Sequence, residues 1–208
     1  MIFPRTEPSL TSKSYNDYKG DLRRDFTNHC AYCLRHERHF GGEANGQIDH
    51  FYPASQFKAS GQLEQSYKYS NLFWSCLECN QCKLESWPDA AETKLGLRFV
   101  DSTLEDTDDH WEVSSLGELT HLTPAGEYTI DILLLWRDDL VRWRREMLEA
   151  KLRIAELRKL IRDPNLIAQD KEEFSVELRE KTLFIHPHPF NRPSRKESRY
   201  RSHPFSPK

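Results

Sequence analysis

The sequence predicts an α+β protein in which a small cysteine-stapled module of two strands and a helix packs with α-helices, including one long amphipathic helix. Two C-x-x-C pairs, two strand-like runs between them and one long segment of helical periodicity lead to this prediction. At 208 residues the chain can bury one sizeable core. We therefore expect one domain over residues 1–162, with its core module at 28–88 and a helical extension at 126–162, followed by a helical segment and tail at 163–208.

Charge and hydropathy exclude two broad classes of protein. Thirty Lys and Arg against 33 Asp and Glu give a net charge of −3, so the chain is not a general polyanion binder and any nucleic-acid contact must be local. No run approaches the roughly 18 consecutive apolar residues of a membrane-spanning helix. The first residues, MIFPRTEPSLTSK, lack the apolar core of a signal peptide. We expect a cytoplasmic protein without a membrane partner.

The first periodic segment covers residues 14–28. Tyr18, Leu22 and Phe26 follow one another at helical spacing, and Ser14 is a favourable helix start. The pattern predicts a short helix with one apolar face, which ends just before the first cysteine.

Two strand-like runs and a helix follow. Residues 46–52, GQIDHFY, are short, aromatic and β-branched and stop at Pro53, as an edge strand or hairpin arm would. Residues 54–70 are polar and are predicted to form a loop. Residues 71–76, NLFWSC, form the second apolar run, and LECNQCKLES after them has helix-forming composition. The core module is therefore predicted as strand, loop, strand, helix.

The C-terminal half is predicted to be mainly helical. Residues 126–161 form the longest periodic segment, with a break near Leu134, and a weaker helical stretch covers 169–183. The apolar stripe of the long segment consists of Ile132, Leu135, Trp136, Leu140, Trp143, Met147 and Leu148. The tail after residue 183 is rich in Pro, Arg and Ser and predicts extended or disordered chain. Its basic and aromatic residues could contact nucleic acid, and a solubilising extension is an equal alternative.

Four of the five cysteines form two C-x-x-C pairs, Cys30 with Cys33 and Cys76 with Cys79. In a reducing compartment such pairs bind metal more often than they form disulfides, and four thiolates suit a closed tetrahedral zinc site. The alternative is a set of incidental buried cysteines. Cys82 would be a fifth ligand and is left out. We predict a structural zinc ion, whose closed coordination leaves no position for chemistry.

The residues with catalytic potential lie between and beside the cysteine pairs. Asp49 and His50 follow each other on the first predicted strand, Asn71 begins the second apolar run, and Asn80 and Lys83 lie on the predicted helix. A neutral imidazole with a pKa of about 6.5 can take a proton from water. A metal ion held by two oxygen ligands can stabilise the charge that builds on a phosphoryl group. This set of residues is therefore suited to phosphodiester hydrolysis.

The segments CAYC, IDHFYP and YSNLFWSCLECNQCK resemble the zinc-containing branch of the HNH endonuclease family, also called the ββα-metal or His-Me finger family. The resemblance implies an endonuclease acting on DNA, with RNA not excluded. It implies that Asp49 and Asn80 hold a divalent cation, that His50 is the general base and that Asn71 orders the loop. The chain departs from some members by carrying Asn80 where they have histidine.

Two details of this site follow from its residue types. Oxygen ligands from Asp and Asn favour Mg²⁺ or Mn²⁺ over metals that prefer nitrogen. Lys83 lies three residues after Asn80, so on a helix the two share a face, and the ammonium could reach a neighbouring phosphate. A solvated lysine is an equal alternative.

A weaker similarity extends past the module. An acidic stretch, a short β-like run and the Leu- and Arg-rich segment up to residue 145 are similar to HNH nucleases of bacterial defence systems, such as the Septu and retron-associated ones. This similarity implies an antiviral effector that works with a partner ATPase. Trp136 and Trp143, which need a surface to cover them, also favour a subunit of a complex. A zinc-bound nucleic-acid-binding or protein-binding module without catalysis is the remaining alternative.

Isolated histidines could indicate a second metal site. His110, His121, His186 and His188 are candidates by residue type alone. Lone histidines are more often hydrogen-bonding partners in a core or at a surface. We therefore predict no second metal site from them.

Overall fold

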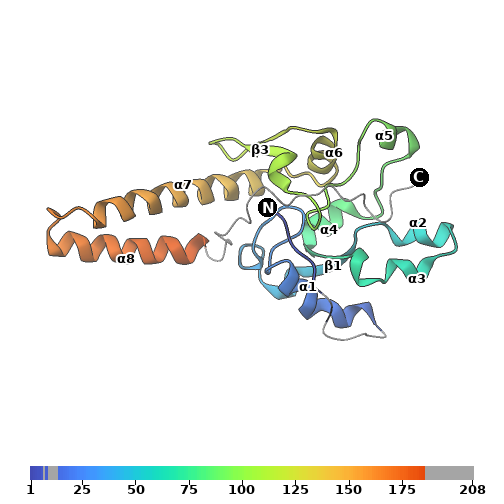
Figure 1. Cartoon of the computed structure of the whole chain (residues 1–208), viewed down its shortest axis with the longest axis horizontal. Helices are drawn as coiled ribbons and strands as arrows, with labels where there is room; N and C mark the ends of the chain where they lie inside the picture. Colours follow the sequence, from blue (N-terminus) through green and yellow to red (C-terminus); the bar gives the residue numbers. More distant parts are fainter. Residues whose placement is uncertain (7, 9–13, 186–208) are drawn as a thin grey trace. The chain divides into compact units, whose positions relative to one another are not determined.

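The computed structural model describes residues 1–6, 8 and 14–185, and these form a mixed α+β structure (Figure 1). The described chain divides into two compact units. Unit 1 consists of Met1–Glu112 and Thr120–Leu135, and unit 2 consists of Val113–Leu119 and the described residues from Trp136 onward. In this division most of the helical segment predicted for residues 126–161 lies in the same unit as the helix that follows it. Residues 186–208 of the predicted tail lie outside the described residues.

Unit 1 combines short helices with a two-stranded sheet. Its helices are α1 (Lys19–Asp25), α2 (Ala54–Ala59), α3 (Leu63–Ser66), α4 (Leu77–Lys83), α5 (Ala90–Lys94) and α6 (Pro124–Ile132). Single 3-10 turns lie at Tyr15–Tyr18, Glu37–His39, Glu43–Asn45, Tyr69–Asn71 and Thr107–Asp109. The sheet pairs β1 (Gly46–His50) with β2 (Leu72–Cys76), and a separate hairpin pairs β3 (Trp111–Val113) with β4 (Leu119–His121). None of the described helices is long and apolar enough to cross a membrane.

The β1–β2 sheet is antiparallel, with Gly46 opposite Cys76 and His50 opposite Leu72. Trp74 in β2 is fully buried, and its ring lies over Gly46. A Cβ atom on residue 46 would lie 1.9 Å from this ring, so only glycine allows the two strands to pair with Trp74 inside. Gly46 therefore allows the start of β1 to lie directly against the Trp74 ring.

Helix α4 follows β2 without a loop. The Cys76 side chain caps its N-terminus, and α4 packs against both strands. The predicted strands and this helix are present at the expected places. The predicted loop at 54–70 is wrong, because it contains α2 and α3. Pro53 stands at the N-cap of α2, and Phe57 is the residue that this short helix buries.

The N-terminal helical segment also follows the prediction. Ser14 caps the first 3-10 turn by accepting a hydrogen bond from the Asn16 backbone N–H, and α1 continues to Asp25. Leu22 and Phe26 are both fully buried, so the predicted apolar face is the one that packs on the core. The helix brings the chain to the first cysteine pair.

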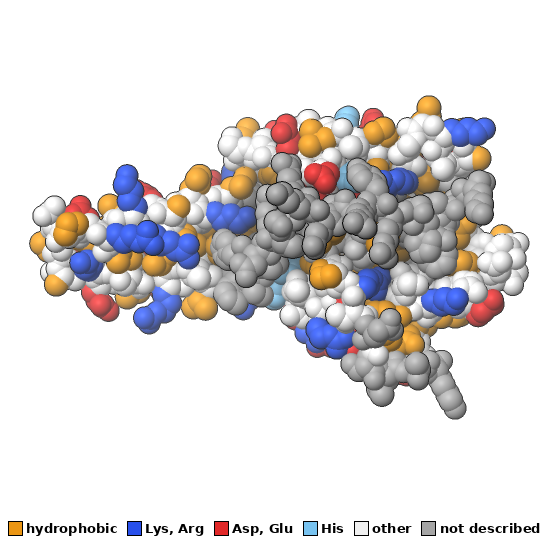
Figure 2. Space-filling model, viewed as in Figure 1, with side chains coloured by type: hydrophobic (Ala, Val, Ile, Leu, Met, Phe, Trp, Pro, Cys, Tyr) orange, Lys and Arg blue, Asp and Glu red, His pale blue; other side chains and the backbone are white. Residues whose placement is uncertain are grey.

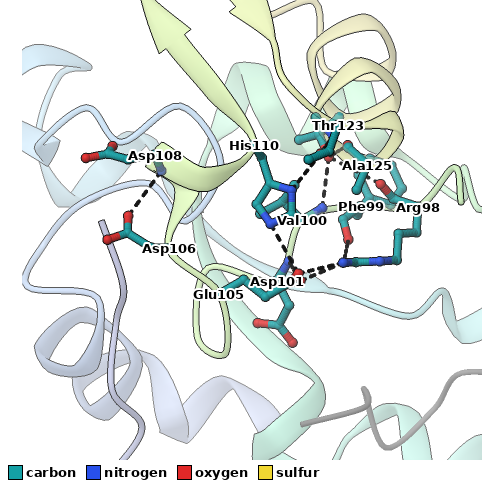
Figure 3. Close-up of polar contacts among 12 residues, drawn as sticks. Arg98, Phe99, Val100, Asp101, Glu105, Asp106, Asp108, His110, Thr123 and Ala125 are labelled. Carbon is teal, nitrogen blue, oxygen red and sulfur yellow. Dashed lines mark hydrogen bonds and ion pairs between the residues drawn. The ribbon is translucent and has the colours of Figure 1, made fainter. Parts of the chain in front are cut away.

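A buried polar network stabilises the later part of unit 1 (Figure 3). The Glu105 carboxylate lies 3.1 Å from His110 Nε2 and accepts two hydrogen bonds from Arg98, of 2.6 and 2.5 Å. The other ring nitrogen of His110 lies 2.7 Å from the Thr123 hydroxyl, which caps α6. Burial raises the pKa of Glu105, but the bonds from His110 and Arg98 outweigh it and lower the pKa to about 2. His110 is thus a core hydrogen-bonding partner.

Replacing this carboxylate should destabilise unit 1 in a pH-dependent way. We expect Glu105→Gln to lower the free energy of unfolding by about 3 kcal/mol at pH 7, since the pKa falls from 4.5 to about 2 on folding. Because the pKa of Glu105 is lowered in the folded state, its ionised carboxylate stabilises the fold fully above pH 4.5. This stabilisation disappears as the pH falls towards 2. Urea unfolding at pH 7 and at pH 3 should show a difference from wild type that shrinks on acidification.

The matched control is Glu112→Gln, which changes an exposed carboxylate nearby. It should alter stability by less than about 0.5 kcal/mol at either pH. Equal effects of the two variants, or a Glu105 effect that does not depend on pH, would contradict the role given to the network.

Unit 2 is built mainly from two long helices, α7 (Asp138–Ile161) and α8 (Ala168–Ile185), which pack side by side (Figure 1). Met147, Ala150 and Ile154 of α7 form a core with Ile185 of α8, and Trp143 packs against it. Arg153 donates two hydrogen bonds to Glu177 across the helix pair, of 2.8 and 2.7 Å. The helices of this unit therefore hold each other through both apolar and charged contacts.

The predicted break in the long helical segment is present. Residues between α6 and α7 leave the helix, and Leu134 has a φ of 49°, a left-handed conformation that ends α6. Trp136 follows the break and is 56% exposed, whereas Leu140 of the same predicted stripe is fully buried. Figure 2 shows apolar and basic side chains next to each other on the visible face of the α7–α8 pair.

Candidate functional site

Four buried cysteines converge in unit 1. Cys30 and Cys33 lie in the loop after α1, and Cys76 and Cys79 lie at the junction of β2 and α4. Their sulfur atoms all lie within 4.8 Å of one another, and Cys33 Sγ is 3.9 Å from Cys76 Sγ. Zn–S bonds of about 2.3 Å in a tetrahedron place the sulfur atoms about 3.8 Å apart, so the spacing fits zinc. Within the described residues, this is the one group of at least three convergent His, Cys, Asp or Glu ligands. The four cysteines could therefore hold a zinc-type metal.

The backbone around the cysteines favours this convergence. The Cys79 N–H lies 3.5 Å from Cys76 Sγ, and the Leu34 N–H donates to the Cys30 carbonyl in a tight turn. Burial raises the pKa of the Cys33 thiol, but hydrogen bonds from the other three thiols outweigh burial and lower it. Hydrogen bonds with the Cys30 and Cys33 thiols raise the pKa of Cys76, although Cys79 lowers it. Cys82 is half-buried and lies outside this group.

The end of β1 carries Asp49 and His50 next to each other. Asp49 is 5% exposed, and its Oδ2 atom accepts a hydrogen bond from the Tyr32 hydroxyl. The Lys83 ammonium lies 3.2 Å from the same oxygen and donates to the His50 carbonyl at 2.7 Å. Within the described chain, Asp49 Oδ1 and the Asn80 side-chain amide make no hydrogen bond. Both therefore keep an oxygen available as a ligand.

Lys83 differs from both sequence-based alternatives. Its side chain is fully buried, and its ammonium lies 5.6 Å from the centre of the Phe99 ring as well as beside Asp49. The solvated lysine is therefore wrong, and a direct contact with a phosphate is not supported. Lys83 instead neutralises and holds a buried carboxylate. No sequence pattern indicates this contact, because Asp49 lies on a strand that is distant from Lys83 along the chain.

His50 is half-buried between two tyrosines. Its ring centroid lies 5.3 Å from that of Tyr15 and 5.7 Å from that of Tyr67. Its Nε2 atom is buried and has no hydrogen-bond partner in the described part of the chain. Burial lowers the pKa of His50, and Lys83 lowers it further, while Asp49 and Glu85 raise it. The net lowering favours a neutral imidazole, which can accept a proton.

Asn71 is fully buried and connects both ends of the segment between β1 and β2. Its Oδ1 accepts from the Tyr52 N–H at 2.8 Å, and its Nδ2 donates to the carbonyls of Tyr52 and Ser66 at 3.0 and 3.1 Å. The Phe51 N–H also donates to the Asn71 carbonyl. These bonds hold the chain directly after His50.

Asn80 lies on α4, one helical turn before Lys83. The two residues share a face of the helix, and Lys83 shows that this face is directed at the end of β1. Asn80 is half-buried, so its amide remains accessible beside the fully buried lysine. The β1–β2–α4 arrangement thus places Asp49 and His50 at the end of β1, which Lys83 contacts from the helix that also carries Asn80.

Several residues of this edge were not predicted from the sequence. Tyr32, Tyr15 and Tyr67 contact Asp49 or His50. Tyr32 had one usable signal, since it lies inside the first C-x-x-C pair and is therefore fixed by the cysteines. Tyr15 lies in the segment predicted as a helix and Tyr67 in the segment predicted as a polar loop, and neither pattern indicates a contact with His50.

A scan against protein-family models finds no match to this chain, and a search of curated proteins finds none either. The class of protein therefore rests on the structure itself. It is an α+β protein with a buried group of four cysteines that could hold a zinc-type metal.

Proposed function

We propose that the chain is a metal-dependent endonuclease of the HNH type that hydrolyses phosphodiester bonds in DNA. The observation that carries the proposal is the edge formed by β1 and α4. There, a histidine with an unpartnered buried Nε2 atom lies next to Asp49, and Lys83 contacts the same strand end from a face of α4 that it shares with Asn80. A base beside two available oxygen ligands is what hydrolysis of a phosphodiester requires.

Each residue has a defined task in this proposal. Asp49 and Asn80 would hold Mg²⁺ or Mn²⁺, which supplies positive charge to the phosphoryl oxygens when bound. His50, held neutral by burial, takes the proton of the attacking water. Asn71 fixes the chain that follows His50. Lys83 acts inside the module by holding Asp49 rather than by contacting the substrate.

The cysteine group has a structural task in the same proposal. Four thiolates around zinc leave no open coordination position, so this ion binds no substrate and no water. Instead it connects the loop that carries Tyr32 to the junction of β2 and α4. The proposal therefore contains two metals of different kinds, a structural Zn²⁺ and a catalytic Mg²⁺ or Mn²⁺.

The test is cleavage of plasmid DNA and of structured RNA by the zinc-loaded full chain, with Mg²⁺, Mn²⁺ or EDTA. We expect metal-dependent cleavage of DNA that EDTA abolishes. Asn80→Ala should reduce the rate about 10- to 100-fold at limiting metal, because it removes an oxygen ligand from a helix that tolerates alanine.

Gln81→Ala is the matched control, because Gln81 is exposed and adjacent on α4. It should cleave like wild type. Cleavage of RNA alone would change the substrate class. If the wild-type chain cleaves nothing, either alone or in the complex described below, a zinc-bound nucleic-acid-binding or protein-binding module is favoured instead.

One observation favours a second form of the same proposal, in which the nuclease works as a subunit of a defence complex with a partner ATPase. Trp136 in unit 2 is 56% exposed, and large exposed aromatic side chains are common where another protein binds. In this form the isolated chain is inactive and the complex cleaves. Co-purification from the native host, followed by the cleavage assay on the complex, separates the two forms.

A further inference from the structure

Tyr32 lies between the candidate zinc group and the candidate ion site. It is the residue directly before Cys33, and it is 2% exposed. Its ring stacks on Phe73 of β2 with centroids 6.2 Å apart, and its hydroxyl donates to Asp49 Oδ2. One side chain thus contacts both strands of the sheet while its backbone belongs to the cysteine loop.

We propose that Tyr32 is a positioning residue that sets the affinity of the catalytic divalent ion by holding the Asp49 carboxylate. This inference rests on the proposed function, since it assigns Asp49 as an ion ligand. The hydroxyl holds Oδ2, which leaves Oδ1 as the oxygen that would bind the ion. Zinc in the cysteine group would act through the same contact, because it fixes the loop that carries Tyr32.

The hydrogen bonds of Asp49 support this role. Its Oδ2 atom receives both Tyr32 and Lys83, whereas Oδ1 receives no donor among the described residues. Lys83 reaches the carboxylate on a long flexible stem, while the phenol ring of Tyr32 is rigid and packed. Tyr32 therefore adds a rigid restraint to the contact that Lys83 supplies, and the two donors together restrict rotation of the carboxylate. Partners of this kind change metal affinity by about 10- to 100-fold when they are removed.

The loop of Tyr32 is tied to the sheet at several points. The Ala31 N–H donates to the Trp74 carbonyl at 2.8 Å, and the Cys30 N–H donates to the Arg35 carbonyl at 2.8 Å. Cys30 and Cys33 flank Tyr32 and point into the cysteine group. If the cysteines separate, the hydroxyl loses its fixed place above Asp49. The structural metal and the affinity for the catalytic ion are thereby linked.

The experiment compares Tyr32→Phe with Tyr69→Phe in the zinc-loaded full chain. Tyr69 provides a matched control, because its hydroxyl also donates to an aspartate, Asp25, at 2.7 Å, in a place away from the candidate ion site. Mn²⁺ binding is measured from the electron paramagnetic resonance signal of free Mn²⁺. We expect Tyr32→Phe to raise the Kd for Mn²⁺ by about 10-fold or more and Tyr69→Phe to leave it within about 2-fold.

Two further readouts separate positioning from loss of structure. Zinc content and the thermal unfolding midpoint should be the same in Tyr32→Phe and Tyr69→Phe. Cleavage by Tyr32→Phe should return to the wild-type rate at saturating Mn²⁺, because a weakened site can still be filled, whereas a misfolded site cannot.

The outcomes distinguish the inference from the proposed function. If the wild-type chain binds Mn²⁺ and Tyr32→Phe binds it with the same Kd, the inference is overturned and the proposed function is not. The inference is also overturned if Tyr32→Phe loses zinc, or if saturating Mn²⁺ does not restore its cleavage. A wild-type chain that binds no Mn²⁺ would overturn both the ion site and the inference.

Discussion

Replacing His50 by alanine is expected to reduce metal-dependent DNA cleavage by a factor of about 10² to 10⁴, the usual contribution of a general base. The imidazole has no substitute at this position, because Lys83 is engaged with Asp49 and the His50 carbonyl, and Asp49 is already an ion ligand in the proposal. Conversion of supercoiled plasmid with time, at saturating Mg²⁺, measures the effect.

The variant should keep its structure and its metals. His50 is half-buried and contributes ring contacts with Tyr15 and Tyr67, so its loss should cost little stability compared with a core residue. Zinc content and the Kd for Mn²⁺ should stay close to wild type. His121→Ala, which removes an exposed histidine, is the control and should cleave normally. Full activity in His50→Ala would be incompatible with the base assignment.

Replacing Cys76 by serine should release the structural metal and unfold the module. Cys76 is fully buried, ends β2 and caps α4, so its sulfur connects the sheet, the helix and the other three cysteines. Structural zinc supplies on the order of 10 kcal/mol of apparent folding free energy in small zinc domains, so its loss should exceed the effect of an ordinary core substitution. Elemental analysis and a thermal unfolding scan measure the two results.

Cys82→Ser is the matched control for this variant. Cys82 lies on the same helix but outside the convergent group. The variant should retain about one zinc ion per chain and unfold like wild type. Two results would contradict the tetrad: zinc retained by Cys76→Ser, or zinc lost equally from both variants.

Local patterns predicted much of the module from the sequence. The cysteine spacing indicated which four sulfur atoms meet, and the apolar runs indicated β1, β2 and α4. Each C-x-x-C pair, each strand and the helix are formed by residues near one another in the chain, so periodicity and spacing are sufficient to find them. The same holds for the break near Leu134, where the helical pattern itself changes.

Features that depend on distant contacts could not be predicted. The burial of Lys83 depends on the place of Asp49 after the strands pair, and a lysine on a helix otherwise favours solvent. Helices α2 and α3 lie in a polar segment, where Phe57 and Ser66 are the residues that become buried. The unit boundary near residue 136 depends on packing between α7 and α8, which the pattern of α7 alone does not contain.

The buried ammonium of Lys83 also makes this residue a chemical reporter. An amine-reactive reagent modifies exposed side chains such as Lys58 and Lys94 in the native protein, but it reaches Lys83 only in molecules whose module has opened. The acylation rate of this one amine, followed by peptide mass spectrometry, therefore measures how often the β1–α4 edge opens. That frequency is the rate at which the buried contacts of Lys83 with Asp49 and with the His50 carbonyl are broken.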